Sequence, residues 1–154
     1  MKLSTKGRYG LRALIDLALY SEKEAVCIQS IATRQNISES YLEQLVRKLK
    51  KAGLVTSVRG AGGGYRLARP ASEISVGDVL RALEGDLEAV TCMGTDAHGS
   101  CGSSDQCVTK YVWQRINDSI TDAVDTMMLD QLVEESRKLR EQGKISTQPC
   151  ENQE

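Results

Sequence analysis

Two apolar stripes of helical spacing, separated by a tight turn, leave few folds open to this chain. A short helix is predicted around Gln29–Gln35, and it ends at Asn36. A stronger helix follows, with a C-terminal stop at Gly53 and four apolar residues recurring on one face: Leu42, Leu45, Val46 and Leu49. Two short helices joined in this way are typical of a helix-turn-helix, whose second helix enters the major groove of DNA.

A longer helix is predicted before this pair and a β-hairpin after it. Residues 5–20 carry apolar side chains on one face: Leu11, Leu14, Ile15, Ala18 and Leu19. Residues 54–69 alternate like a strand, reverse at the glycines of 60–64 and return as a second strand. A glycine-rich loop can also bind nucleotide phosphates, but that use needs a helix directly after the loop, and here a strand-like run follows. The hairpin therefore predicts a wing, with arginines near its tip that could contact DNA: Arg59, Arg66 and Arg69.

The charge of the chain is divided between its two halves. Residues 1–72 hold 13 Lys and Arg against five Asp and Glu, a net charge of +8, whereas residues 73–154 carry −9. The whole-chain charge of −1 hides this division. A basic half favours a polyanion such as DNA, and an acidic half suits dimerisation or sensing.

The polar face of the second helix of the pair carries candidate DNA contacts, with bases met near its start and phosphates near its end. Glu43 and Gln44 lie off its apolar stripe, as does the basic cluster that begins at Arg47 and runs to Lys51. Ser40 and Glu43 also form the S-x-x-E pattern of a capping box. Glu43 can equally accept a hydrogen bond from a cytosine amino group, and an acid among bases favours that reading without excluding a cap. Tyr41 fits either the core or a phosphate contact.

Residues 91–107 differ in character from the rest of the chain. The segment TCMGTDAHGSCGSSDQC is rich in small polar residues and contains Cys92, Cys101, Cys107 and the only histidine, His98. The gaps between the cysteines are wider than zinc fingers and ribbons normally use, and iron–sulfur clusters accept wider, asymmetric loops. Zinc, a thiol switch and the absence of a metal remain alternatives. Of the other cysteines, Cys27 is expected to be buried, and Cys150 lies in a polar tail with no structural role expected.

Helices are predicted on both sides of the cysteine segment. One begins at Ser75, with Asp78 at its fourth position, and ends at Gly85. After Cys107 a single apolar stripe continues for over four turns: Val112, Ile116, Ile120, Ala123 and Met127. A second apolar face over residues 129–139 indicates a separate short helix. A long single-stripe helix after a DNA-binding module favours pairing with its twin, because palindromic operators match two-fold proteins.

Four segments together resemble one family. MKLSTKGRYGLRALIDLA, SESYLEQLVRKLKKAGLV, VRGAGGGYRLARP and the three-cysteine loop look like the winged-helix transcriptional regulators of the IscR type. That family includes regulators of iron–sulfur cluster assembly, cysteine metabolism, nitric oxide and iron. The resemblance covers roughly residues 1–140. It implies a mostly α-helical fold with a small β-hairpin wing and a long C-terminal dimerisation helix.

The resemblance also implies roles for individual residues. Ser40, Glu43 and Gln44 match positions that read bases, Arg59 beside Gly60 matches one that enters the minor groove, and Ser38 and Tyr41 match positions near the DNA backbone. Cys92, Cys101 and Cys107 match the three ligands of a 2Fe–2S cluster, although the first gap is longer here than is usual.

The fourth cluster ligand departs from the family. It is normally a histidine three residues after the last cysteine, and Lys110 stands there. Lysine is a poor cluster ligand, so His98 is the first candidate, with Asp96, Asp105 or a residue outside the loop as alternatives. A changed ligand alters cluster potential and lability.

We therefore expect a non-enzymatic, cluster-sensing regulator, mainly a repressor, of iron–sulfur assembly genes. Its alternative is a regulator of the same fold that responds through thiols or cysteine metabolism.

The expected organisation is a winged helix-turn-helix over 1–72, a connecting helix over 73–90, the cluster loop over 91–107, dimerisation helices over 108–142 and a disordered tail over 143–154. Expected partners are palindromic double-stranded DNA, a second copy of the chain and the iron–sulfur assembly machinery as cluster donor. No apolar stretch is long enough to span a membrane and no signal peptide is evident, so a cytoplasmic location is expected.

Overall fold

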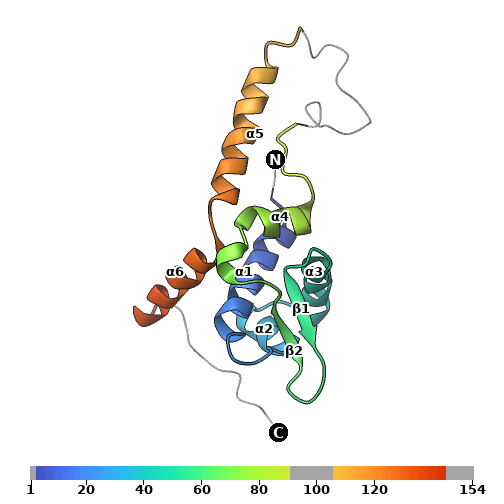
Figure 1. Ribbon diagram of the computed structural model, residues 1–154, viewed down its shortest axis with the longest axis vertical. Helices are drawn as coiled ribbons and strands as arrows, with labels where there is room; N and C mark the ends of the chain where they lie inside the picture. Colours follow the sequence, from blue (N-terminus) through green and yellow to red (C-terminus); the bar gives the residue numbers. More distant parts are fainter. Residues whose placement is uncertain (1–2, 91–105, 145–154) are drawn as a thin grey trace.

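The computed structural model describes residues 3–90 and 106–144 of the 154-residue chain. Figure 1 shows a helical body with a small hairpin on one side and a single helix that projects from it. In chain order the elements are α1 (Thr5–Tyr20), α2 (Ile28–Gln35), α3 (Glu39–Lys51), β1 (Val55–Val58), β2 (Gly64–Leu67), the 3-10 turn η1 (Ala71–Glu73), α4 (Val76–Glu84), α5 (Lys110–Asp125) and α6 (Leu129–Glu141). The mostly helical winged fold expected from the sequence is confirmed.

The turn between α2 and α3 has the form of a helix-turn-helix. Asn36 ends α2 in the left-handed conformation, with φ of 52°, which asparagine tolerates better than most residues. The hydroxyl of Ser38 then accepts a hydrogen bond from the backbone N–H of Tyr41 and caps α3. Ser38 is therefore the cap, and Ser40 lies inside the first turn. The capping-box reading of Ser40 and Glu43 is wrong, which removes the structural alternative for Glu43.

The hairpin is a two-stranded antiparallel ladder in which Val55 faces Leu67 and Val58 faces Gly64. It is attached to the body by an isolated bridge between Val26 and Tyr65. Gly64, with φ of 155°, passes so close to the backbone of Val26 that a Cβ atom would overlap it. The wing is thus fixed at its base, while its tip at residues 59–62 is exposed.

The hydrophobic core joins elements from both ends of the chain. Leu14, Leu42, Ile74 and Leu129 are all at most 1% exposed and lie in one cluster. The core of the winged domain is therefore not confined to residues 1–72, because α4 and α6 complete it. The short helix expected after residue 129 is present, but it packs on α1 rather than standing apart.

The projecting helix α5 is anchored at its C-terminal half. Ile120 and Val124 pack on a small cluster formed by Val76, Leu80 and Leu87. Arg81 of α4 makes a two-pronged ion pair with Asp125, at 2.7 and 2.8 Å. The expected stripe ends with α5 at Asp125, so Met127 lies in the following turn and not on the helix. None of the helices within the described ranges has the length and apolarity needed to cross a membrane.

Candidate DNA interface and cysteine segment

The exposed face of α3 presents four of the residues expected to contact DNA. Ser40, Glu43, Gln44 and Arg47 are all exposed, opposite the buried stripe of the helix. Among the residues that the structure describes, Glu43, Gln44 and Arg47 have no hydrogen bond or ion pair through their side chains. Their polar groups are therefore available to a ligand that approaches this face.

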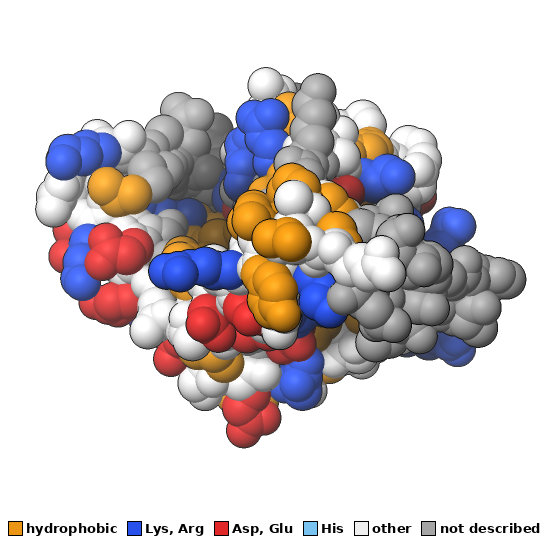
Figure 2. All heavy atoms as spheres, turned by 90° about the horizontal axis from the view of Figure 1, so that it is seen from above, with side chains coloured by type: hydrophobic (Ala, Val, Ile, Leu, Met, Phe, Trp, Pro, Cys, Tyr) orange, Lys and Arg blue, Asp and Glu red, His pale blue; other side chains and the backbone are white. Residues whose placement is uncertain are grey.

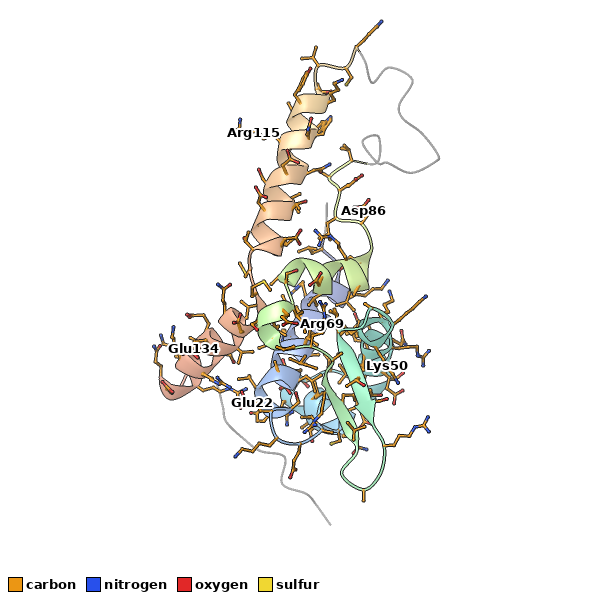
Figure 3. All side chains as sticks on the ribbon, in the orientation of Figure 1. Glu22, Lys50, Arg69, Asp86, Arg115 and Glu134 are labelled. Carbon is orange, nitrogen blue, oxygen red and sulfur yellow. The ribbon has the colours of Figure 1, made fainter. Side chains whose placement is uncertain are left out.

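Both flanks of α3 are tied to neighbouring elements. Tyr41 is half-buried, its ring packs edge-on against Tyr9 with centroids 6.1 Å apart, and its hydroxyl donates to Thr5 at 3.2 Å. The ammonium group of Lys48 donates to the backbone carbonyl of Leu83, at the end of α4, at 3.3 Å. On the other flank, Lys50 donates to Ser57 of the wing at 2.8 Å, and Figure 3 shows Lys50 on the hairpin side of the molecule. Lys48 and Lys50 thus connect α3 to α4 and to the wing.

The wing offers one arginine at its tip. Arg59 is exposed beside Gly60, whose φ of 107° suits glycine, and no partner holds Arg59 within the described part of the chain. Arg66 instead donates to the carbonyl of Lys23 at 2.6 Å. Arg69 lies 3.7 Å from Asp78. The expectation of three arginines at the tip is therefore corrected, since Arg66 and Arg69 serve the attachment of the hairpin.

A buried ion pair fixes α2 against α1. Asp16 is 1% exposed. Its carboxylate accepts hydrogen bonds from Nε and Nη2 of Arg34 and from the side-chain amide of Gln35. A buried carboxylate needs such partners, because an unpaired charge in the core is very costly. Asp16 interrupts the apolar stripe of residues 5–20, and that interruption was the available sequence signal for a buried pair.

Cys27 is exposed, so the expectation that it is buried is wrong. It precedes α2 as the N-cap residue, which places its side chain outside the apolar stripe of that helix. Its sulfur lies 2.9 Å from the hydroxyl of Ser30. That hydrogen bond, opposed by partial desolvation and aided by Arg34, lowers the pKa of the Cys27 thiol.

Cys107 is the one expected cluster ligand within the described residues. It lies just before α5, with its sulfur 3.1 Å from the hydroxyl of Thr109. This hydrogen bond and a second one from the backbone N–H of Lys110 lower the pKa of the Cys107 thiol. A hydrogen-bonded thiolate is the form that binds metal, so its surroundings fit a cluster ligand.

The other expected ligands, Cys92, Cys101 and His98, lie outside the described residues. Within the described ranges, no three His, Cys, Asp or Glu side chains are grouped to hold a metal ion. Lys110, where the family has histidine, begins α5, and its ammonium group lies 5.6 Å from the ring centre of Tyr111.

Both boundaries of the cysteine segment contact α5. Before the segment, the backbone N–H of Ala89 donates to the side chain of Asn117 at 2.8 Å. After it, Cys107 leads directly into the first turn of α5. Sequence reasoning missed Asn117, because a single polar residue beside an apolar stripe gives no signal of a distant partner.

Comparison with known proteins agrees with the exposed α3 face and the adjacent wing. Residues 3–135 match the model of the Rrf2 family, described as an iron-dependent transcriptional regulator. The chain belongs to the Rrf2 family. As a transcriptional regulator of the IscR type it binds DNA and is not an enzyme, as the sequence indicated.

Curated relatives with the same description support this assignment. The chain is 46% identical over 133 residues to the HTH-type transcriptional regulator IscR of Pectobacterium atrosepticum, covering 86% of this chain and 79% of that one. It is 42% identical over 147 residues to the protein of the same name from Escherichia coli, covering 96% and 89%.

Two solved structures of this Rrf2 protein's relatives resemble the fold equally well. T. potens IscR has a TM-score of 0.71 at 40% identity, covering 96% of this chain and 94% of that one. CymR, the global cysteine regulator of B. subtilis, also has a TM-score of 0.71, at 39% identity with 87% and 97% covered. The fold alone therefore does not separate an IscR from a cysteine regulator.

Proposed function

We propose that the chain is an iron–sulfur cluster-sensing regulator, mainly a repressor, of genes for cluster assembly. The observation that carries this is Cys107, a hydrogen-bonded thiol of lowered pKa placed where a segment with two more cysteines joins α5. Its relatives of 42–46% identity bear the IscR name. The site of action is the cytoplasm, where the DNA lies.

The proposed DNA contacts follow from the exposed face of α3 and the wing tip. Ser40, Glu43 and Gln44 would read base edges in the major groove, with Glu43 accepting from a cytosine amino group. Arg47 would contact phosphate, as would Ser38 and Tyr41 near the start of the helix. Arg59, beside Gly60 at the wing tip, would enter the minor groove.

The proposed cofactor is a 2Fe–2S cluster held by Cys92, Cys101 and Cys107, with His98 as the fourth ligand. When bound, the group would supply a redox-active link across residues 91–107, and the iron–sulfur assembly machinery would deliver it. Ala89, just before this segment, is bonded to α5, and Cys107, at its end, lies just before α5. Binding or loss of the cluster would therefore alter how α5 packs against α4. Only a difference in stability between two such arrangements can shift DNA affinity.

We further propose a homodimer on a palindromic operator. The projecting half of α5 exposes apolar side chains: Tyr111, Val112 and Ile116 are 66%, 50% and 37% exposed, and Val108, just before the helix, is 80% exposed. Figure 2, which looks onto the projecting end of the molecule, shows hydrophobic side chains gathered at the centre of this face. A second copy of α5 would cover them.

The test of cluster binding is anaerobic purification with iron and sulfide counts on single variants. Cys92→Ala, Cys101→Ala and Cys107→Ala are each expected to lose bound iron, whereas Cys150→Ala, in the polar tail, keeps it. Gel shifts with loaded and apo protein on the DNA upstream of its own gene then report the regulatory effect. Full iron retention in any of the first three variants contradicts the ligand assignment.

A second candidate is a regulator that responds through thiols or cysteine metabolism without a cluster. Two observations favour it: the likeness to CymR equals that to T. potens IscR, and Lys110 replaces the family histidine. This candidate predicts sequence-specific DNA binding by protein that contains no iron after anaerobic preparation.

A further inference from the structure

The last turn of α4 contacts both α1 and α3. Leu83 is 2% exposed and packs so closely on Gly10 of α1 that a Cβ atom there would overlap its side chain. The carboxylate of Glu84 accepts hydrogen bonds from the backbone N–H groups of Ser4 and Gly7, both at 2.9 Å. The first turn of α1 is therefore fixed to the end of α4.

The same turn of α4 is bound by α3 through Lys48. The carbonyl of Leu83 belongs to the last turn of α4, where carbonyls have no partner within the helix. The ammonium group of Lys48 supplies one at 3.3 Å, and a cation at a helix C-terminus is also favoured by the helix dipole. This contact reaches from α3 to a residue 35 positions later in the chain.

The hydrogen bond to α4 distinguishes Lys48 from the residues of α3 whose side chains have no partner among the described residues. Lys48 and Tyr41 are seven residues apart, close to two helical turns, so they lie on the same flank of α3. Tyr41 is bound to α1 and Lys48 to α4. Lys48 and Lys51 are both exposed, but Lys51 has no side-chain partner in the part of the chain that the structure describes.

We infer that Lys48 is a positioning residue for DNA recognition: by bonding the end of α4 it sets the orientation of α3, and thereby the placement of Glu43 and Gln44 against base edges. Without it, the apolar stripe of α3 remains packed, but one flank loses its fixed distance from α4. Sequence-specific binding then suffers, whereas attraction to phosphates is retained. After Glu84 the chain continues to Ala89, whose backbone N–H is bonded to Asn117 in the middle of α5. The end of α4 therefore connects α3 with α5.

The experiment compares Lys48→Gln with the matched variant Lys51→Gln in the full chain. Two labelled duplexes are used, one selected by the wild-type protein from a random-sequence pool and one of mixed sequence with the same length. Affinities are measured by fluorescence anisotropy over a series of KCl concentrations. Both variants remove one lysine charge from α3, but only Lys48→Gln also removes a contact to α4.

For Lys48→Gln we expect roughly tenfold weaker binding to the selected duplex, the size of one lost hydrogen bond to a charged group. Binding to the mixed duplex and the salt slope should stay at wild-type values, and Lys48→Arg should restore the selected duplex. For Lys51→Gln we expect weaker binding to both duplexes and a salt slope smaller by about 0.9, as for one lost phosphate contact.

The inference is overturned if Lys48→Gln behaves like Lys51→Gln, because Lys48 would then be a phosphate contact. It is also overturned if Lys48→Gln leaves the selected duplex unaffected. The test does not require a bound cluster. If the protein contains no iron, the proposed cofactor is contradicted, but the comparison of the lysine variants can still be interpreted.

Discussion

Glu43 shows how the surroundings of a single residue decide its role. It is an exposed carboxylate on a helix rich in lysine and arginine, and the described residues offer it no hydrogen bond. The cap of α3 is provided by Ser38 instead. A negative charge on a surface that approaches phosphates lowers general affinity for DNA, which supports the proposal that Glu43 accepts a hydrogen bond from a base.

Replacing Glu43 by Ala is therefore expected to weaken discrimination between operator variants by ~1–3 kcal/mol per site. Binding to mixed-sequence DNA should become tighter, since one repulsive charge is removed. Anisotropy titrations over operators changed one base pair at a time measure the preference. The control is Glu73→Ala, which removes an exposed acid outside α3. An operator preference unchanged by Glu43→Ala would contradict the base-reading role.

Among the elements, the N-terminus of α1 is bound by the C-terminal end of α4. Gly7 and Gly10 of α1 let α4 approach closely, and Glu84 of α4 supplies a negative charge at the N-terminus of α1. Although partial desolvation opposes it, hydrogen bonds from Ser4 and Gly7 lower the pKa of Glu84. The ionised form is thus favoured in the folded protein.

This contact predicts a pH-dependent stability. Because the pKa of Glu84 is lower folded than unfolded, its contribution is full above the unfolded pKa and is lost as pH falls through the folded one. Glu84→Gln should lower the free energy of unfolding by about 1 kcal/mol at neutral pH, as for a lost helix cap. Urea unfolding along a pH series should show this difference shrinking in acid. Glu73→Gln, at an exposed acid, should show no comparable loss, and a pH-independent effect of Glu84→Gln would contradict the ionised cap.

At the level of the whole molecule, the α3–wing face and α6 lie on different sides. The α3–wing face carries Arg47, Lys51 and Arg59, whereas α6, with Glu134, lies on the side away from the hairpin (Figure 3). The α5 helix extends beyond both and holds its exposed apolar side chains clear of the core. In the proposed dimer, this arrangement leaves the α3–wing face free when two copies pair through α5.

Ile116→Glu is expected to shift the protein from dimer toward monomer, because it places a charge within the apolar stripe of α5. Gln114→Glu adds the same charge on the opposite face of the helix and should leave the assembly unchanged. Sedimentation velocity at matched concentrations measures both. An undisturbed dimer in Ile116→Glu would exclude this face as the interface.

Local patterns were enough to predict most elements and the exposure of the α3 residues proposed to contact DNA. The helices over 5–20 and 76–84, the turn at Asn36 and the glycine hairpin depend on spacing, capping and φ preferences within a few residues, so the linear chain contains the needed information. The same holds for the exposed face of α3, which is simply the side opposite its apolar stripe.

Contacts between distant segments were decided only by the tertiary structure. Packing turned Arg66 and Arg69 away from the wing tip and brought Lys48 to the end of α4. It also placed α6 in the core and exposed Cys27. The partners in these contacts come from parts of the chain far apart in sequence, and no local periodicity encodes which side chain reaches which carbonyl or carboxylate.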